Sequence, residues 1–334
     1  VSVTTADDAI NFNHTIDGGQ TLTLASGSAA TTLQGAIGGN TALSALTVNS
    51  AGAGTVEITN IGGVTGATAI GNTSTGTLTL DGTAYSTAGT QTYTAATGGG
   101  NIDITNGSGV TFTTTNDNII FATSDVDLAN NATTTITTGT GAGVVTFGAA
   151  IEGNSATAPF NELLVITSGT GNVTFTGAIG ATNALGGLTV NSSAGDGDIT
   201  FTSTIGDAGN AGVVGTTAIG NAATADLNFN STIYSFDGAT TITAAAGDTI
   251  DVTAGPTSFI TAADNISFAT GNIELTNGSN LVIDTGAGGG NITVGGGIDG
   301  ASQETVTIDA GAGTASVGVI GSGTEIGALT IGSA

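Results

Sequence analysis

The sequence predicts an all-β fold, a parallel β-helix in which one continuous β-solenoid spans residues 1–334. Short runs of alternating apolar and polar residues recur along the chain, and an imperfect repeat of about 135–147 residues runs through it. Aromatic side chains are scarce, with 11 Phe, 3 Tyr and no Trp. Tandem β-sandwiches, the other architecture open to many short strands, usually fill their cores with large side chains. We therefore favour the narrow core of a solenoid, filled by stacked Val, Ile, Leu, Ala and Thr.

The strands of the first copy are expected where branched or aromatic residues alternate with Thr, Asp or Asn. They lie at 10–12, 21–24, 32–37, 46–48, 56–58, 78–80, 91–95, 101–105, 110–113, 118–122, 126–128 and 134–137. Gly, Asn, Asp and Ser separate these runs, as in turns, and no helical period of useful length is present. Pro159 and Pro256 fall between strands, where a missing N–H is harmless. We expect roughly 20–30 residues in each turn of the solenoid.

Later copies repeat these strands in order. GAIGGNTALSALTVNS at 35–50 returns as GAIGATNALGGLTVNS at 177–192, and NIIFATSDVDL at 118–128 returns as NISFATGNIEL at 265–275. The offset between the first two copies grows through insertions at 154–160 and near 207–212, both in Gly-, Ala- and Asn-rich gaps. The copies span approximately 10–144, 145–291 and 292–334, the third being truncated.

The charge composition excludes several classes of partner. The chain has no Lys or Arg, 25 Asp and Glu, and a formal net charge of −25. Nucleic-acid binding depends on cationic neutralisation of phosphates, so we exclude it, and docking on anionic lipid is disfavoured for the same reason. No apolar run approaches the roughly 20 residues of a membrane-spanning helix. Attraction to cations and repulsion between copies remain.

The absence of Cys fits an exported protein that needs no disulfide. Residues 1–5, VSVTT, begin as a strand with no signal peptide before them, so a leader has been removed or the chain is an excerpt. Neither end resembles a solenoid cap, because LTIGSA at 329–334 also ends as a strand. We expect that the chain continues on both sides or that copies stack end to end, and either arrangement gives a fibre.

The runs NVTFTGAIGATNALGGLTVNS at 172–192 and DITFTSTIG at 198–206 carry a family resemblance. They resemble the β-strand repeats of large bacterial secreted surface proteins, the filamentous-haemagglutinin-like and autotransporter-passenger proteins. The resemblance covers most of the chain and is specific for the class. It implies a right-handed β-helix, export to the cell surface, and a role in adhesion, matrix or surface layers. No catalytic motif carries over.

Few residues of the chain could support catalysis. His14 is the only histidine, follows a strand, and is replaced by Ala149 in the second copy, so we interpret it as a turn residue. Without Cys or Lys, thiol nucleophiles and Schiff bases are excluded. Two close carboxylate pairs exist, but neither is kept intact in the other copy: Asp125 and Asp127 align with Asn272 and Glu274, and Asp196 and Asp198 align with Gly54 and Val56. We expect no enzyme activity.

Calcium is the cofactor that the sequence leaves open, because it takes oxygen ligands from Asp, Asn and backbone carbonyls in turns. The candidate ligands are Asp103, Asp125, Asp127, Asp196, Asp198, Asp248 and Asp251. The alternative for each is a solvated turn carboxylate. If calcium screens these acids, it should raise the melting temperature or promote assembly; no other cofactor is expected.

These observations predict a non-catalytic, extracellular structural protein, secreted or on a bacterial cell surface, that self-associates into a filament, sheath or surface layer. Its partners would be other copies of itself, end to end and laterally, and divalent cations or cell-surface glycans. The main alternative is a stalk or passenger segment of a cell-surface adhesin. A minor alternative is an ice-binding solenoid, suggested by TTIT at 134–137 and VTFTTT at 110–115.

Overall fold

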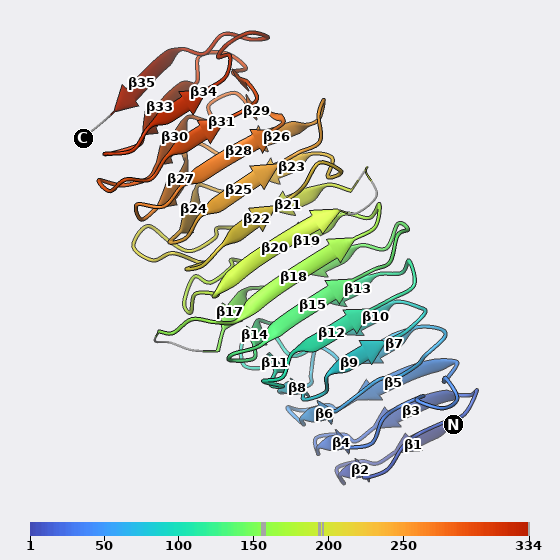
Figure 1. Ribbon diagram of the computed structural model, residues 1–334. Coiled ribbons are helices and arrows are strands. Elements are labelled where there is room, and N and C mark those ends of the chain that lie inside the picture. The colour runs from blue at the N-terminus through green and yellow to red at the C-terminus, as the bar shows by residue number, and fades with distance from the viewer. Residues whose placement is uncertain (155–157, 193–194, 196, 333–334) are drawn as a thin grey trace. The chain divides into compact units, whose positions relative to one another are not determined.

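The computed structural model describes residues 1–154, 158–192, 195 and 197–332. It is an all-β solenoid of about 14 turns in which the strands pair in parallel, as the sequence predicted (Figure 1). The chain divides into two compact units, unit 1 (1–154 and 162–171) and unit 2 (155–161 and 172–334). The described residues include no helix long and apolar enough to cross a lipid bilayer.

Three sheets line unit 1, and each turn of the chain adds a strand to them in succession. Sheet 1 contains β1 (Ser2–Thr4), β3 (Thr21–Ala25), β5 (Ala45–Asn49), β7 (Thr68–Ile70), β10 (Gln91–Tyr93), β13 (Ile119–Phe121) and β16 (Val145–Phe147). Sheet 2 contains β2 (Ile10–Phe12), β4 (Thr31–Leu33), β6 (Val56–Ile58), β8 (Leu78–Leu80), β11 (Ile102–Ile104), β14 (Val126–Leu128) and β17 (Ile151–Gly153). Sheet 3 contains β9 (Ala84–Ser86), β12 (Val110–Thr113), β15 (Thr133–Thr137) and β18 (Leu163–Ser168).

Unit 2 is built in the same way. Sheet 4 contains β19 (Val173–Phe175), β21 (Ile199–Phe201), β23 (Leu227–Phe229), β26 (Thr249–Val252), β29 (Asn272–Leu275) and β32 (Ile298–Asp299). Sheet 5 contains β20 (Gly187–Ser192), β22 (Thr217–Ile219), β25 (Thr240–Thr243), β28 (Ile266–Thr270), β31 (Ile292–Val294) and β34 (Ala315–Val317). Sheet 6 contains β24 (Ile233–Phe236), β27 (Thr257–Thr261), β30 (Leu281–Asp284), β33 (Thr305–Asp309) and β35 (Ala328–Gly332).

Within each unit, neighbouring strands pair in register, so equivalent residues of successive turns stack on one another. The shortest spacing between paired residues is 21, from Ser2 to Thr23, and among the longest is 30, from Thr134 to Leu164. This confirms the expected turn length. Successive side chains of a strand point to opposite faces, and buried and less buried residues alternate along most strands, as in Leu78–Leu80 and Ile102–Ile104. Alternation in the sequence therefore sets which side chains enter the core.

The core is more aromatic than the sequence suggested. Every Phe and Tyr except Phe12 and Phe160 is fully buried. The rings of Phe121 and Phe147 stack with centroids 4.8 Å apart in unit 1, and Phe175 and Phe201 stack at 4.9 Å in unit 2. Parallel strands place equivalent side chains about 4.8 Å apart, which is a good spacing for stacked rings. A narrow solenoid core can therefore hold large side chains where they recur turn after turn.

The strands predicted in the first copy are present; those predicted at 32–37, 91–95, 101–105 and 118–122 are shorter than expected, and two further strands occur. The strand predicted at 32–37 ends at Leu33, and Ile37 forms only isolated bridges with Ile16 and Ile61. Between them the chain lies so close to the previous turn that a Cβ on Gly35 would be 2.2 Å from the carbonyl carbon of His14. The strands Thr68–Ile70 and Ala84–Ser86 were not predicted. Their outward or flanking positions carry Ala and Ser, which give a weak alternating pattern, although Tyr85 at the centre of the second is fully buried.

The sequence repeat is not a whole number of turns. In unit 1, β2 lies in sheet 2, but its counterpart β16 lies in sheet 1; β3 lies in sheet 1, but its counterpart β18 lies in sheet 3. In unit 2, LTV of β20 lies in sheet 5, and its counterpart LTI of β35 lies in sheet 6. Successive copies of these motifs therefore lie on different sheets of a unit, and their outward side chains face different directions.

Candidate functional site

In-register stacking gathers acidic side chains into a row on sheet 2 of unit 1. Asp103 on β11 is the cross-strand partner of Asp127 on β14, and Asp127 is the partner of Glu152 on β17. Equivalent positions on neighbouring strands are about 4.8 Å apart, so like charges are held next to one another. We call Asp103, Asp127 and Glu152 the first acidic row.

Two carboxyl groups of the first acidic row, those of Asp103 and Asp127, have raised pKa values. Burial raises the pKa of the Asp103 carboxyl above its ordinary value, and the neighbouring Asp127 charge and a hydrogen bond with Asp127 raise it further. Burial also raises the pKa of Asp127, although Asn101 Nδ2 donates to its Oδ2 at 3.0 Å. A hydrogen bond between two carboxyl groups requires a proton on one of them, so this pair binds protons more readily than isolated aspartates.

A second acidic row lies on sheet 4 of unit 2. Asp251 on β26 pairs with Glu274 on β29, which pairs with Asp299 on β32. These three residues are the repeat counterparts of Asp103, Asp127 and Glu152, at offsets of 147 or 148. An equivalent acidic row therefore recurs one repeat length later in the chain. This row could not be predicted from carboxylates that lie close together in the sequence, because its members are one turn of the solenoid apart.

The second acidic row has the same electrostatic character as the first. Burial raises the pKa of Asp251, and the charges of Asp226 and Asp198 add to the effect. The pKa of Glu274 is raised by burial, then by its row neighbours Asp251 and Asp299. Glu152, Asp226, Glu274 and Asp299 thus join these clusters, although none was among the predicted ligands. The sequence signal that could have predicted these clusters is an acidic residue in the middle of a strand or at the end of a turn, repeated once per turn.

The predicted calcium ligands separate into two groups. Asp103, Asp125 and Asp127 lie together in unit 1, and Asp198, Asp248 and Asp251 lie together in unit 2, while Asp196 lies outside the described residues. Asp248 and Glu274 line a shallow hollow of about 300 Å³. Nevertheless, in the parts of the chain that the structure describes, no three His, Cys, Asp or Glu side chains are grouped so as to hold a metal ion. Calcium binding remains a prediction.

Several candidate carboxylates link one turn to the next. Asp125 Oδ1 accepts a hydrogen bond from the backbone N–H of Ala150 at 3.1 Å, one turn later. Asp198 Oδ1 accepts from the N–H of Asp226 at 3.3 Å, and Asp226 Oδ1 accepts from the N–H of Thr249 at 2.8 Å. These bonds satisfy backbone donors at corners, where sheet pairing is interrupted. The carboxylates therefore have a structural use in the absence of any ligand.

Asparagine performs the same role without charge. Asn265 Oδ1 accepts from the N–H of Asn291 at 2.8 Å, and Asn291 Oδ1 accepts from the N–H of Thr314 at 2.9 Å. In unit 1, Asn60 Oδ1 accepts from the N–H groups of Thr83 and Ala84 at 2.9 and 3.0 Å. We call these inter-turn bonds corner clamps. They explain why Asn and Asp precede so many strands in the sequence.

One buried carboxylate stands apart from the rows. Glu304 Oε2 accepts from the N–H groups of Ala301 and Ser302, both at 2.8 Å, and Oε1 accepts from Ser302 Oγ at 2.9 Å and the N–H of Gly278 at 3.1 Å. The hydrogen bond from the Ser302 backbone is the largest of the effects that lower the pKa of Glu304 to about 2. Its donors come from one tight turn and from the preceding coil, so Glu304 ties these two segments together.

His14, the only histidine, is exposed at a bend between β2 and the next turn.

No family model, curated protein or solved structure matches the chain. The described surface carries the two acidic rows and the Asn and Asp corner clamps.

Proposed function

We propose that this protein is a non-catalytic extracellular structural protein, secreted or on a bacterial cell surface, that self-associates into a filament, sheath or surface layer. The observation that supports this proposal is the repetition of the outer surface. On sheet 5, one outward position of successive strands carries Thr189, Ala218, Thr241, Ser267, Thr293 and Ser316 in register. This row of short side chains offers a neighbour the same contact in every turn.

A periodic surface favours association because contacts add together. Once one pair of turns on two copies is aligned, the turns above and below are aligned as well, and each further contact forms at high effective concentration. Short Thr, Ser and Ala side chains lose little rotamer freedom when they are covered. Weak contacts can therefore produce a stable lateral or end-to-end assembly.

The charge of the chain opposes this assembly. A net charge of −25 with no cationic side chain makes copies repel one another, and the acidic rows concentrate the negative charge on particular sheets. Divalent cations or mild acid would reduce the repulsion. We therefore propose that calcium promotes assembly by neutralising the rows collectively, and that association is weak at neutral pH and low ionic strength.

Sedimentation velocity and negative-stain electron microscopy of the purified chain test this proposal. At pH 7 and low salt we expect predominantly monomers, and with millimolar calcium we expect ordered filaments or sheets that dissolve on chelation. Sodium chloride at the same ionic strength is the control for general screening, and it should be less effective. A chain that stays monomeric with calcium and at pH 4.5 would contradict self-association.

The same charge is the observation that favours the second candidate, a stalk or passenger segment of a cell-surface adhesin. Such a segment holds a binding region away from the cell, so repulsion between neighbours would be useful and assembly would not be needed. The two candidates differ in one outcome: a stalk is monomeric under every condition above and retains its melting temperature when calcium is added.

A further inference from the structure

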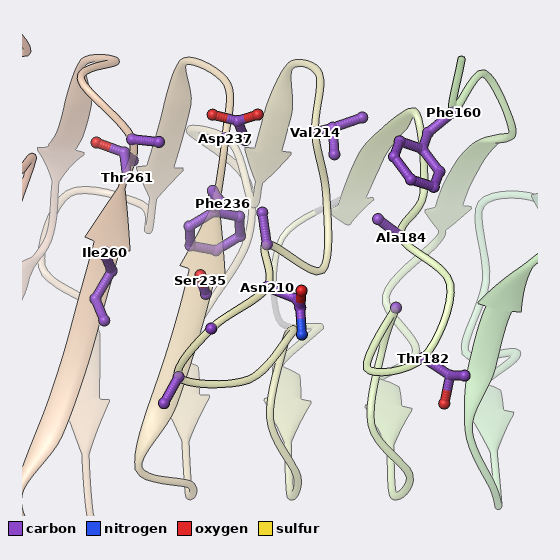
Figure 2. Close-up of a pocket in the computed structure, with 15 residues that line it drawn as sticks. Phe160, Thr182, Ala184, Asn210, Val214, Ser235, Phe236, Asp237, Ile260 and Thr261 are labelled. Carbon is purple, nitrogen blue, oxygen red and sulfur yellow. The ribbon is translucent and has the colours of Figure 1, made fainter. Parts of the chain in front are cut away.

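Two insertions distinguish the second sequence copy from the first, and described residues of both line one groove in unit 2. The first insertion is 154–160 and the second lies near 207–212. Phe160 from the first and Ala208 to Ala211 from the second line the same groove, which has a volume of about 490 Å³ (Figure 2). Residues 155–157 lie outside the description. Segments about 50 residues apart in the chain therefore build one concave surface.

The second insertion is held in a defined shape. Asp207 Oδ1 accepts hydrogen bonds from the backbone N–H groups of Gly209 at 2.7 Å and Asn210 at 2.8 Å. Asn210 Nδ2 donates to both carboxylate oxygens of Asp207, at 3.2 and 3.1 Å. This arrangement uses the donors of the Asn210 amide and leaves its Oδ1 as an acceptor for another group. The wall of the groove is thus organised before any ligand binds.

The first insertion contributes an aromatic surface. Phe160 and Phe12 are the two aromatic residues that are not fully buried, and only Phe160 lies at the groove. Figure 2 shows the Phe160 ring beside Ala184 and Val214, with Phe236 farther along the same wall. A partly exposed ring in a rigid groove can cover the apolar C–H face of a flat ligand.

Polar groups surround this apolar wall. Asp237 is exposed at the end of β24, and Ser235 lies two residues before it. In the described part of the chain, neither the Asp237 carboxylate nor the Ser235 hydroxyl makes a hydrogen bond. Asp237 and Asn210 Oδ1 can only accept hydrogen bonds, whereas the Ser235 hydroxyl can donate or accept, so a ligand that carries several hydroxyl groups matches this lining.

The first copy provides a natural comparison for these positions. Phe236 and Asp237 replace Thr87 and Ala88 of the first copy, and no counterpart of Phe160 exists there. The two copies thus differ here by two phenylalanines, of which Phe160 is partly exposed and Phe236 is fully buried, and by the exposed Asp237 carboxylate. Phe236 fills the core, whereas the fold does not require Phe160 or Asp237, since the first copy forms the same strands without them.

We propose that this groove binds a neutral oligosaccharide. A pyranose ring has an apolar C–H face that suits Phe160 and outward hydroxyl donors that suit Asp237, Ser235 and Asn210. Anionic ligands are disfavoured, because the chain has no Lys or Arg to pair with them and Asp237 would repel them. The volume falls in the range of small-molecule sites, about 300–1,000 Å³.

Binding of neutral tetrasaccharides tests the proposal, with β-1,4-glucose, β-1,4-mannose, α-1,6-glucose and β-1,4-galactose tetramers as probes. Saturation-transfer NMR and calorimetry on the full chain should detect binding of at least one probe. We expect Phe160→Ala and Asp237→Ala each to weaken that binding by tenfold or more. The matched controls are Phe12→Ala and Asp8→Ala, which make the same changes in unit 1 and should leave affinity within twofold.

Two further measurements make the result decisive. Ala208→Trp places a bulky side chain at an exposed position in the groove, so it should abolish binding while leaving the melting temperature unchanged. The proposal is overturned if none of the four tetramers binds the wild-type chain, or if binding survives Phe160→Ala and Ala208→Trp. It is also overturned if these variants change self-association and leave saccharide affinity unaltered, since the groove would then be a protein contact.

Discussion

At the residue scale, several buried polar side chains of this protein join one turn to the next. Gln91 is fully buried, and its amide bonds to the carbonyl oxygens of Tyr85 and Thr113 at 2.9 and 2.8 Å while its Oε1 accepts from the Tyr93 hydroxyl at 2.9 Å. Burial of a polar group is tolerated when each of its atoms has a partner. Gln91 meets this condition by bridging adjacent coils, as Glu304 does with charge.

Glu304 provides a test of this interpretation. Its pKa is lowered from 4.5 to about 2, so its contribution to stability is complete above pH 4.5 and is lost as the pH falls towards 2. We expect Glu304→Gln to reduce the free energy of unfolding by about 1–2 kcal/mol at pH 7, after allowance for solvent screening. Chemical denaturation of the variant and wild type, repeated from pH 7 to pH 2.5, measures the difference.

The control is Glu325→Gln, which removes an exposed carboxylate of the same unit. It should alter stability by less than about 0.5 kcal/mol. The difference between Glu304→Gln and wild type should shrink below pH 4.5, because the wild-type carboxylate then becomes protonated and loses its advantage. If the loss of unfolding free energy in Glu304→Gln stays constant down to pH 2.5, the charge of Glu304 does not stabilise the turn.

At the element scale, the acidic rows show how stacking creates a property that no single strand has. Burial raises the pKa of Asp127 on β14, and the charge of Asp125, just before the same strand, adds to the effect. The effect of stacking is clearest at Asp103 one turn earlier, where burial and then the Asp127 charge raise the carboxyl pKa. A raised pKa for an acid means that the folded chain binds a proton more tightly than the unfolded chain. The rows therefore cost stability at pH 7 and cost less as the pH falls.

This sign gives a prediction for Asp127→Asn. The substitution removes a charge from the centre of the first acidic row and keeps an oxygen that can accept from Asn101. We expect the unfolding free energy at pH 7 to rise by about 0.5–1 kcal/mol, since the pair is partly exposed and screened. Thermal melts at pH 7 and pH 4 measure the gain, which should decrease at pH 4, where wild-type row carboxyls take up protons.

Asp8→Asn is the matched control, because it removes the same charge from an exposed position outside the rows. It reports the effect of net charge alone and should give a smaller gain at pH 7. Equal gains for Asp8→Asn and Asp127→Asn would mean that row geometry has no special electrostatic cost.

Strand-level features differ in how well the sequence predicts them. Runs such as 78–80 and 126–128 were placed with correct boundaries, because Leu or Val alternates there with one polar residue. The strand around Tyr85 was missed, since Ala84 and Ser86 give little contrast in polarity. The acidic rows were missed because Asp103 and Asp127 are 24 residues apart, and their contact depends on the register of two turns.

At the scale of the whole molecule, the repeat and the turn have different lengths. The sequence revealed the copies, but it did not reveal that β3 and its counterpart β18 belong to different sheets of unit 1. Register depends on how many residues each corner takes up, and corners of Gly, Asn and Ala tolerate insertions. For the same reason, the convergence of Phe160 and Asn210 at one groove could not be predicted from their positions in the chain.

The first acidic row lies on sheet 2 of unit 1, whereas unit 2 carries an acidic row on sheet 4 and a row of short Thr, Ser and Ala side chains on sheet 5. Rows on two sheets of unit 2 would let that unit meet neighbours in two directions. This arrangement suits a layer or sheath better than a single line of contacts. It also means that calcium or acid, by relieving the rows, would act on several contact surfaces at once.

X-ray fibre diffraction from assemblies formed with calcium tests the central claim most directly. If the chain winds around an axis and its repeating surface directs assembly along that axis, aligned samples should give a strong meridional reflection near 4.8 Å, the spacing of stacked strands. Failure to form ordered assemblies, or assemblies whose 4.8 Å reflection is absent or lies off the meridian, would contradict the account.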